Sequence, residues 1–250
     1  KRHHYRLWAK WGADVNGKIL AAESKIYADG GAYVYTSGKV LGNATLLATG
    51  PYDIENVSTD AYCVYTNNIP GGAFRGFGGP QAAFMAESQV DKLAQALGMD
   101  PVELRSRNLF KDGSIISMGS PLPGKVSIRE VVERAAIEGG WEKSETGWVK
   151  PEVKQSELAH IRRGLGFACG YKNIGFSYGY RENCGATIEL FGDSEIEKAV
   201  LYHAGAEVGQ GAHTVFLQFA AESLGIPEEK IEAHFSDTAT SLNSGSVSAS

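Results

Sequence analysis

The order of strand pairs and helices along the chain is the feature that most limits its fold. Residues 5–27 alternate apolar and polar side chains on either side of Asn16-Gly17, a two-residue turn that tolerates positive φ. Residues 185–202 alternate in the same way about Gly192-Asp193, and helical periodicity follows in both halves. These patterns predict an α+β protein of two mixed α/β domains, each with an antiparallel hairpin and packed helices. The sequence itself shows no matching repeat.

Periodicity and capping residues place most of the other elements. A helix over about 80–97 should end at Gly98, which can adopt the left-handed conformation. The next helix should begin with Asp100 as its N-cap, and a third should open with a capping box of Ser127 and Glu130. These three helices should close one domain. The remaining expected segments are an irregular glycine-rich stretch over 30–51, strands over 56–65 and 231–235, and a helix over about 213–224 whose apolar side includes Val215 and Phe219.

A change of composition marks the expected domain boundary. Between Glu142 and Arg163 the sequence becomes charged and aperiodic, which places the boundary near residue 150. The expected domains are therefore 1–150 and 151–250. The first residue is Lys1 rather than Met, and residues 237–250 follow a strand with nothing after them to close the second domain. The chain is therefore expected to be an internal piece of a longer protein.

Net charge and hydropathy narrow the classes of partner. The 24 basic and 29 acidic residues give a formal charge of −5, and neither sign gathers into a block that would attract nucleic acid or an anionic membrane. No apolar run approaches the ~20 residues that span a bilayer, and the first residues do not resemble a signal peptide. A cytoplasmic protein without nucleic-acid or membrane partners is expected.

The positions of cysteine and histidine argue against a metal held by protein side chains. Cys63, Cys169 and Cys184 form no CxxC pair, and the six histidines share no ligand spacing. The thiols are expected to be reduced and mostly buried. Any bound metal should therefore be held by ligands other than the side chains of this chain.

Two glycine-rich loops, 71–81 and 205–214, are each followed directly by a helix. Such a loop can turn backbone N–H groups toward an anion or a flat ligand, and the helix N-terminus adds partial positive charge. A phosphate-bearing cofactor is one explanation; the other is that the glycines only allow tight turns before helices. Neither loop has a Walker or Rossmann pattern. The first loop favours binding, because it offers Phe74 and Phe77 for ring stacking and the planar donors of Arg75.

Several segments resemble one family, in that family's own order. They are AFRGFGGPQ at 73–81 with LRSRNL at 104–109, GAEVGQGAHT at 205–214, and SVSAS at 246–250. Together they resemble the molybdopterin-binding large subunit of the xanthine dehydrogenase/aldehyde oxidase family, and the resemblance covers essentially all 250 residues. It implies that the chain binds molybdopterin, as such or as its cytosine dinucleotide form, with molybdenum held by the pterin dithiolene.

The resemblance also assigns roles to individual residues. Arg75 should present its backbone N–H toward the ligands of the metal, and Phe77 should lie against the face of the substrate. The Phe74 side chain is expected to anchor the loop in the core. An ordinary strand with a buried ring explains Phe176 equally well. The expected cofactor-binding residues are Phe74, Arg75, Gly76, Gly209, Gln210, Ala249 and Ser250, and the expected substrate-binding residues are Phe77, Phe176 and Ser177.

A reaction and a set of partners follow from the same resemblance. Members of the family oxidise an aldehyde or an N-heteroaromatic ring with oxygen derived from water. Their electrons pass to 2Fe-2S clusters and FAD on partner subunits or segments, within an assembly that is a dimer of complete complexes. The general base is a glutamate near the C-terminal end of the subunit, so no catalytic residue is expected in this chain. The 250-residue piece alone should be inactive and carry little cofactor.

At two residues, a role known in the family is not expected in this chain. Asn43 lies where purine-oxidising members have an arginine that grips the purine, which argues against xanthine as the substrate. Glu207 is better explained as a capping or salt-bridged loop residue than as the general base. The alternative class of function is a non-catalytic homologue that acts as a scaffold or interaction module, since glycine-rich loops can persist for structural reasons.

Overall fold

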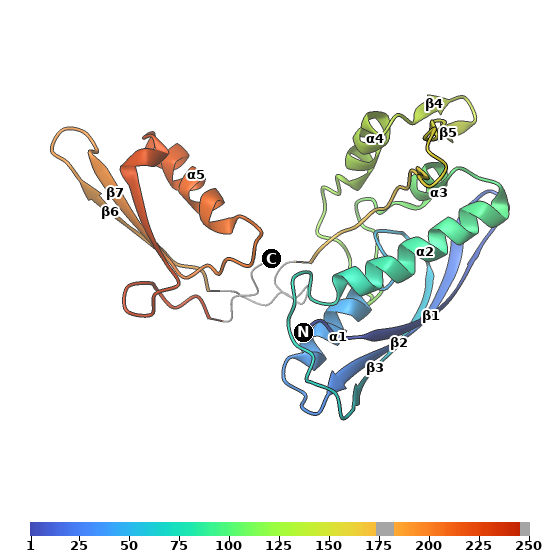
Figure 1. The fold of residues 1–250 in the computed structure, drawn as a ribbon, viewed down its shortest axis with the longest axis horizontal. Coiled ribbons are helices and arrows are strands. Elements are labelled where there is room, and N and C mark those ends of the chain that lie inside the picture. Colours follow the sequence, from blue (N-terminus) through green and yellow to red (C-terminus); the bar gives the residue numbers. More distant parts are fainter. Residues whose placement is uncertain (174–182, 246–250) are drawn as a thin grey trace. The chain divides into compact units, whose positions relative to one another are not determined.

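The computed structural model describes residues 1–173 and 183–245, and the chain divides into two compact units, Lys1–Lys172 and Asn173–Ser250 (Figure 1). Each unit contains a three-stranded sheet with helix on it, so the α+β class predicted from the sequence is confirmed. Within the described ranges, no helix has both the length and the apolar character needed to cross a bilayer.

The division between the units falls later than the boundary expected near residue 150. The segment that precedes it packs on unit 1. The Cys169 backbone N–H donates to the Glu87 carboxylate at 2.8 Å, and the Tyr171 hydroxyl donates to the Leu46 carbonyl at 2.9 Å. The sequence becomes charged and aperiodic from Glu142, but the chain continues to pack on unit 1 as far as Lys172.

Unit 1 is built on a mixed sheet. The β1–β2 hairpin is antiparallel as predicted, whereas β3 pairs with β2 in parallel. The hairpin turn forms at Asn16-Gly17, where Gly17 has a φ of +81°. The Asp14 carboxylate closes this turn by accepting the backbone N–H groups of Asn16 and Lys18 at 2.9 and 2.8 Å. The strands, in their order across the sheet, are β1 Tyr5–Ala13, β2 Ile19–Gly31 and β3 Asn56–Tyr65.

Helices cover one face of this sheet. Helix α2 packs against β1, and α1 packs against β3 (Figure 1). The core between them includes Trp11, Ile19, Ile26 and Val90, all at most 8% exposed. The helices are α1 Ser37–Leu46, α2 Gly79–Leu97, α3 Pro101–Asn108 and α4 Ile128–Glu138, and a short hairpin follows with strands β4 Glu142–Ser144 and β5 Gly147–Val149.

Helix α1 corrects the prediction of an irregular stretch over 30–51. Its two glycines each lower the intrinsic helix propensity by about 1 kcal/mol relative to alanine, so the sequence does not look helical. Burial compensates for that loss, because Val40, Asn43 and Ala44 lie on one face and are almost fully buried. Tertiary packing, rather than local propensity, therefore holds this helix.

The helix ends agree with the capping residues, with one exception. Gly98 ends α2 in the left-handed conformation with a φ of +62°, and the Asp100 carboxylate caps α3 by accepting the Val102 N–H at 2.7 Å. Helix α4 begins at Ile128 as expected, but Ser127 makes no side-chain capping bond, so the predicted capping box is wrong. The Ser127 backbone, with φ −94° and ψ +5°, is not in the extended geometry of a residue that caps with its side chain.

A buried ion pair joins α2 to α3 and to two further segments. The Arg105 side chain is fully buried and contacts the Glu87 carboxylate through Nε at 2.9 Å and Nη2 at 2.8 Å. Nη2 also lies 2.9 Å from Asp91, although its N–H directions make no well-aligned hydrogen bond. Glu87 accepts the Tyr52 hydroxyl at 2.5 Å in addition to the Cys169 N–H. Burial, and then the Glu87 charge, raise the pKa of Tyr52, so its hydroxyl stays protonated and donates.

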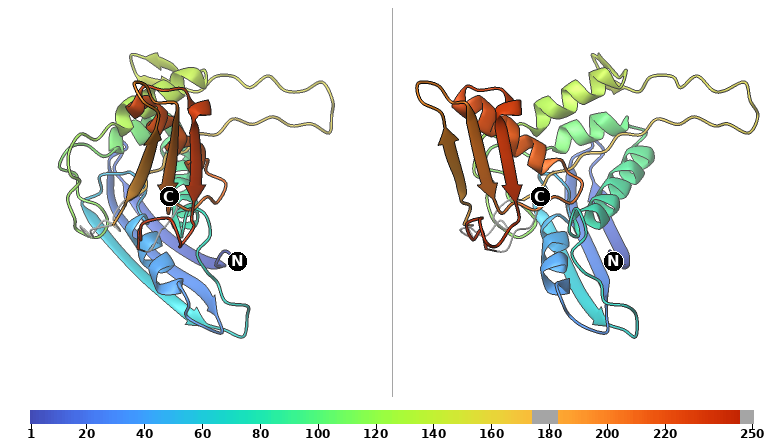
Figure 2. Two further views of the ribbon diagram at one scale, coloured as in Figure 1. Left: turned by 90° about the vertical axis from the view of Figure 1, so that its left-hand side faces the viewer. Right: turned by 60° about the vertical axis from the view of Figure 1, so that its left-hand side comes forward.

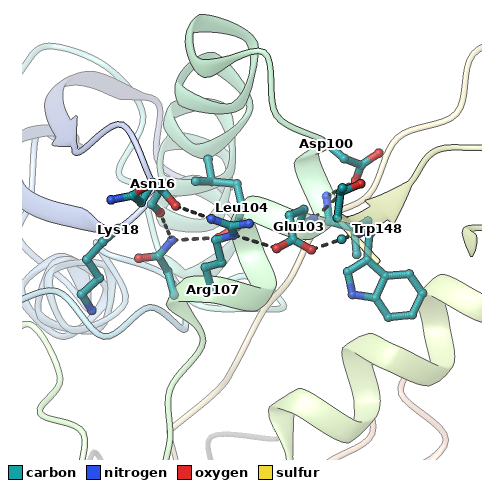
Figure 3. A network of polar contacts seen from close by, with 12 residues as sticks. Asn16, Lys18, Asp100, Glu103, Leu104, Arg107 and Trp148 are labelled. Carbon is teal, nitrogen blue, oxygen red and sulfur yellow. Dashed lines mark hydrogen bonds and ion pairs between the residues drawn. The ribbon is translucent and has the colours of Figure 1, made fainter. Parts of the chain in front are cut away.

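A second polar network ties α3 to the hairpins on either side of it (Figure 3). Arg107 donates to Glu103 at 2.7 Å and also donates to the Asn16 carbonyl in the β1–β2 turn. Glu103 in turn accepts the backbone N–H of Trp148 in β5 at 3.0 Å. The short helix α3 therefore links the start of the sheet to the β4–β5 hairpin.

Unit 2 has the same strand order as unit 1. Its first two strands form the expected hairpin, and β8 then joins β7 in parallel after α5, as β3 joins β2 after α1. Figure 2 shows α5 along one face of this sheet.

The predicted apolar side of α5 is wrong at Val215 and Phe219, which are 40% and 64% exposed. The residues of α5 that are buried are Ala220 and Ala221. The elements are β6 Ala186–Phe191, β7 Lys198–His203, α5 Ala212–Leu224, a single 3₁₀ turn at Glu228–Lys230 and β8 Ile231–Phe235.

Removal of the Glu87 carboxylate should destabilise unit 1 strongly. Glu87→Ala leaves the buried Arg105 guanidinium with the exposed Asp91 carboxylate and the Pro101 carbonyl, and we expect the free energy of unfolding to fall by about 3 kcal/mol or more in urea denaturation. Glu23→Ala is the control, because the Lys25–Glu23 pair is exposed and 3.7 Å long, and it should cost less than about 1 kcal/mol. Equal losses in the two variants would contradict the structural role of the buried pair.

Candidate functional site

The first glycine-rich loop leaves the end of β3 and leads directly into α2. It contains three successive residues in the left-handed region, Gly76, Phe77 and Gly78, with φ values of +88°, +48° and +88°. Two tight turns shape it: the Phe77 N–H donates to the Phe74 carbonyl at 2.7 Å, and the Gly79 N–H donates to the Gly76 carbonyl at 2.9 Å. A left-handed phenylalanine costs roughly 1–2 kcal/mol, so its surroundings must hold it there.

Helix α1 forms the support of this loop. A Cβ atom at Gly78 would lie 2.3 Å from the Val40 carbonyl oxygen and 3.2 Å from the Ala44 Cβ, so only glycine fits against the helix. One residue earlier, the Asn43 side-chain amide donates to the Phe77 carbonyl at 2.6 Å. This bond was not predicted from the sequence. The spacing of Val40, Asn43 and Ala44 at i, i+3 and i+4 was the available signal.

The N-terminal residues hold the other side of the loop. The Arg2 guanidinium donates to the Arg75 carbonyl at 2.7 Å, and its central carbon lies 4.6 Å from the centre of the Phe74 ring. The Gly72 N–H donates to the Lys1 carbonyl at 2.9 Å. Phe74 is 52% exposed, so the expectation that its side chain anchors the loop in the core is wrong. The Phe74 ring stays at the surface, where Arg2 stacks on it.

The side chains that follow Phe74 present a mixed surface. Arg75 is exposed, and Phe77 is partly buried. An exposed aromatic ring beside an exposed guanidinium can contact a flat ligand that carries negative charge, by ring stacking and by paired hydrogen bonds. The first loop therefore offers an aromatic ring and a positive charge to a ligand of that kind.

The second glycine-rich loop encloses an anion of its own. The Glu207 carboxylate accepts the backbone N–H groups of Gly209, Gly211 and His213 at 2.5, 3.1 and 3.4 Å, at the N-terminus of α5. Burial opposes ionisation, but the backbone N–H groups outweigh it and hold the pKa of Glu207 below its ordinary value. This geometry agrees with the expectation from the sequence that Glu207 is a capping residue rather than the general base. The N–H groups expected to face a ligand anion are directed at Glu207 instead.

Gln210 is also bonded within the loop. Its side-chain amide donates to the Ala206 carbonyl at 3.0 Å and accepts the Val208 N–H at 2.7 Å. Two histidines brace the base of the loop at Gly205, where the His203 Nδ1 accepts the Gly205 N–H at 2.7 Å and the His213 Nε2 lies 2.9 Å from the Gly205 carbonyl. The loop is therefore preformed by hydrogen bonds among its own residues.

The structure brings only part of the predicted set together. Phe74, Arg75, Gly76 and Phe77 lie on one loop of unit 1, whereas Gly209 and Gln210 lie on the loop of unit 2. Among the residues that the structure describes, no three or more His, Cys, Asp or Glu side chains cluster as a metal would require. The predicted residues outside the described ranges are Phe176, Ser177, Ala249 and Ser250.

Comparison with known proteins assigns both halves of the chain. Residues 1–109 and residues 141–250 each match a sequence model of a molybdopterin cofactor-binding domain. The whole chain is 32% identical, over 253 aligned residues, to a probable xanthine dehydrogenase subunit of Bacillus subtilis, of which it covers 32%. The chain belongs to the xanthine dehydrogenase family. Within that family, 54% of the chain is 42% identical to the nicotinate dehydrogenase large molybdopterin subunit of Eubacterium barkeri, of which the match covers 32%.

A solved structure of an oxidoreductase shares the fold. The aldehyde oxidoreductase from Desulfovibrio desulfuricans matches 98% of the chain with a TM-score of 0.70 and 27% identity, and the match covers 26% of that protein. The chain thus spans about a third or less of the length of these relatives. Both of its domains are molybdopterin cofactor-binding domains, as the loop motifs predicted.

The exposure of Phe74 gives a direct test of its place in the loop. Phe74→Ala removes an exposed cation–π contact with Arg2, so we expect the free energy of unfolding to fall by less than about 1 kcal/mol. Phe110→Ala is the matched control, because Phe110 is 4% exposed and its loss should cost about 3–5 kcal/mol. Urea denaturation measures both. A loss at Phe74 as large as that at Phe110 would restore the core assignment.

The capping of the second loop by Glu207 should make that loop sensitive to acid. The folded-state pKa of Glu207 is depressed, so its stabilisation is present above 4.5, the ordinary value, and is lost as the pH falls through the lower folded value. The protection factors of the amides at residues 205–213, which correct for the pH dependence of intrinsic exchange, should therefore fall below about pH 4.5 in the wild type but change less in Glu207→Gln. Glu222→Gln, an exposed glutamate on α5, should behave as the wild type. The same acid response in all three proteins would show that Glu207 does not hold the loop.

Proposed function

We propose that the chain is part of a molybdenum hydroxylase subunit that binds the molybdopterin cofactor and oxidises an aldehyde or N-heteroaromatic substrate with oxygen derived from water. The observation that carries this proposal is the loop with the AFRGFGGPQ motif, whose backbone is held in an unfavourable conformation by α1 and by Arg2. Strain of this kind persists where the geometry of a site requires it. The names of the relatives, a xanthine dehydrogenase subunit and a nicotinate dehydrogenase subunit, support the same class of reaction.

The proposed cofactor contacts come from both loops. The proposed cofactor-binding residues are Phe74, Arg75 and Gly76 of the first loop, and Gly209 and Gln210 of the second. Ala249 and Ser250 would complete the set, as the resemblance implies. When bound, the molybdenum–pterin group supplies the redox chemistry.

The substrate is proposed to lie against Phe77, together with Phe176 and Ser177. A flat substrate has few polar groups, so ring faces must supply much of its orientation, and orientation contributes directly to rate. Asn43 offers an amide rather than a guanidinium, and that amide is bonded to the loop, which argues further against xanthine. The general base is proposed to be a glutamate outside this chain.

The electrons would leave through 2Fe-2S clusters and FAD on partner subunits or segments. The iron–sulfur clusters require sets of cysteine ligands, and the three cysteines of this chain are free and far apart in sequence. The proposed assembly is a cytoplasmic dimer of complete complexes.

The proposal predicts a specific kinetic effect at Phe77. In the full-length enzyme purified with its partners, Phe77→Ala should lower kcat/KM by roughly one to two orders of magnitude, about 1.4–3 kcal/mol, because the substrate loses its orienting ring. The molybdenum content, measured by metal analysis, should stay near that of the wild type.

Phe84→Ala is the control for this measurement. Phe84 lies on α2 in the same unit and is 71% exposed, so its removal should leave kcat/KM unchanged. Wild-type kinetics in Phe77→Ala would place the substrate elsewhere. A wild-type enzyme with negligible molybdenum despite adequate supply would favour the non-catalytic alternative.

A further inference from the structure

The Phe77 carbonyl is the point where a side chain of α1 reaches the backbone of the first loop. The Asn43 Nδ2 atom lies 2.6 Å from this oxygen, and Asn43 is 7% exposed. A carbonyl can only accept, so the chemistry itself requires the amide NH2 group at this position. The two residues lie 34 positions apart in the sequence, and the bond joins helix α1 to the first loop.

The backbone around Phe77 has few other ways to satisfy this carbonyl. Helix α2 begins at Gly79, and the Gly78 carbonyl already accepts the Ala82 N–H at 3.2 Å. Phe77 lies one residue before that ladder of hydrogen bonds and within the left-handed run of the loop. A partly buried carbonyl that loses its donor is destabilised, so the native conformation of Phe77 depends on Asn43.

Packing alone does not explain an asparagine at this position. The neighbouring α1 residues that contact the loop, Val40 and Ala44, are apolar, and an apolar side chain of similar size at position 43 would fill the same space. A buried amide is costly unless it forms hydrogen bonds. The bond to the loop is therefore the reason for the amide.

We infer that Asn43 is a positioning residue, whose amide holds Phe77 in its left-handed conformation and thereby aims the Phe77 ring. Its amide nitrogen serves the loop backbone rather than gripping a substrate. The effect of Asn43 on catalysis rests on the proposed function, whereas its effect on the loop does not. The two can therefore be tested separately.

Hydrogen exchange in the full-length protein, with its cofactor and partners, measures the effect on the loop. Asn43→Ala should accelerate the exchange of amides in residues 74–79 by about tenfold, while exchange in the middle of α2, at residues 85–95, stays unchanged as a reference for folding. In the same protein, kcat/KM should fall by about tenfold at constant molybdenum content.

A double-mutant cycle with Phe77→Gly tests the mechanism. Glycine adopts a φ of +48° without cost, so Asn43→Ala should accelerate exchange of the loop much less in the Phe77→Gly background than in the wild type. Asn56→Ala is the matched control, because it removes a bond of the same kind, from Nδ2 to the Leu20 carbonyl at 3.0 Å, at another part of the sheet. It should leave exchange of the loop unchanged.

Three results would overturn the inference. They are wild-type exchange of residues 74–79 in Asn43→Ala, an equal acceleration in the loop and in α2, which would make Asn43 a general packing residue, or additive effects in the double-mutant cycle. A wild-type enzyme without molybdenum or turnover would instead overturn the proposed function and leave the exchange results valid.

Discussion

The Glu87 carboxylate is the interaction on which the arrangement of unit 1 depends. It accepts hydrogen bonds from the Arg105 guanidinium, the Tyr52 hydroxyl and the Cys169 backbone N–H. These bonds hold the middle of α2 against three other segments. The glycine-rich loop enters the same helix at its first turn. A rigid α2 therefore fixes one end of the loop, so the position of the loop depends on a buried polar cluster in the middle of the helix.

The sequence predicted the elements whose ends are decided by local chemistry. The Asn16-Gly17 turn and the glycine stop at Gly98 form as expected, because backbone conformation at these residues is set by neighbours in sequence. Helix α1 could not be predicted in this way, since its glycines oppose helix formation and its stability comes from burial against β3 and α2. The capping box predicted at Ser127 does not form for a related reason. The backbone conformation of Ser127 before α4 does not let its side chain cap the helix.

For the candidate site, too, the sequence predicted contiguous features but not contacts between distant residues. The motifs identified the loops and their residues, because a contiguous glycine-rich sequence is visible without a fold. They could not show that Arg2 stacks on Phe74, since that contact joins residues 72 positions apart and keeps the ring at the surface. The capping role expected for Glu207 forms, but the composition of the loop alone could not show which backbone N–H groups its carboxylate accepts.

The fit between Gly78 and α1 leaves no room for a single Cβ atom. Loop and helix are therefore packed as one unit, and a change of backbone path in one requires a matching change in the other. A lineage that acquires a new substrate on this scaffold has two routes: to replace helix and loop together, or to keep both and vary the exposed side chains that they display, such as Arg75. The second route needs only one substitution at a time, so diversity on this surface should accumulate in side chains while the backbone path stays the same.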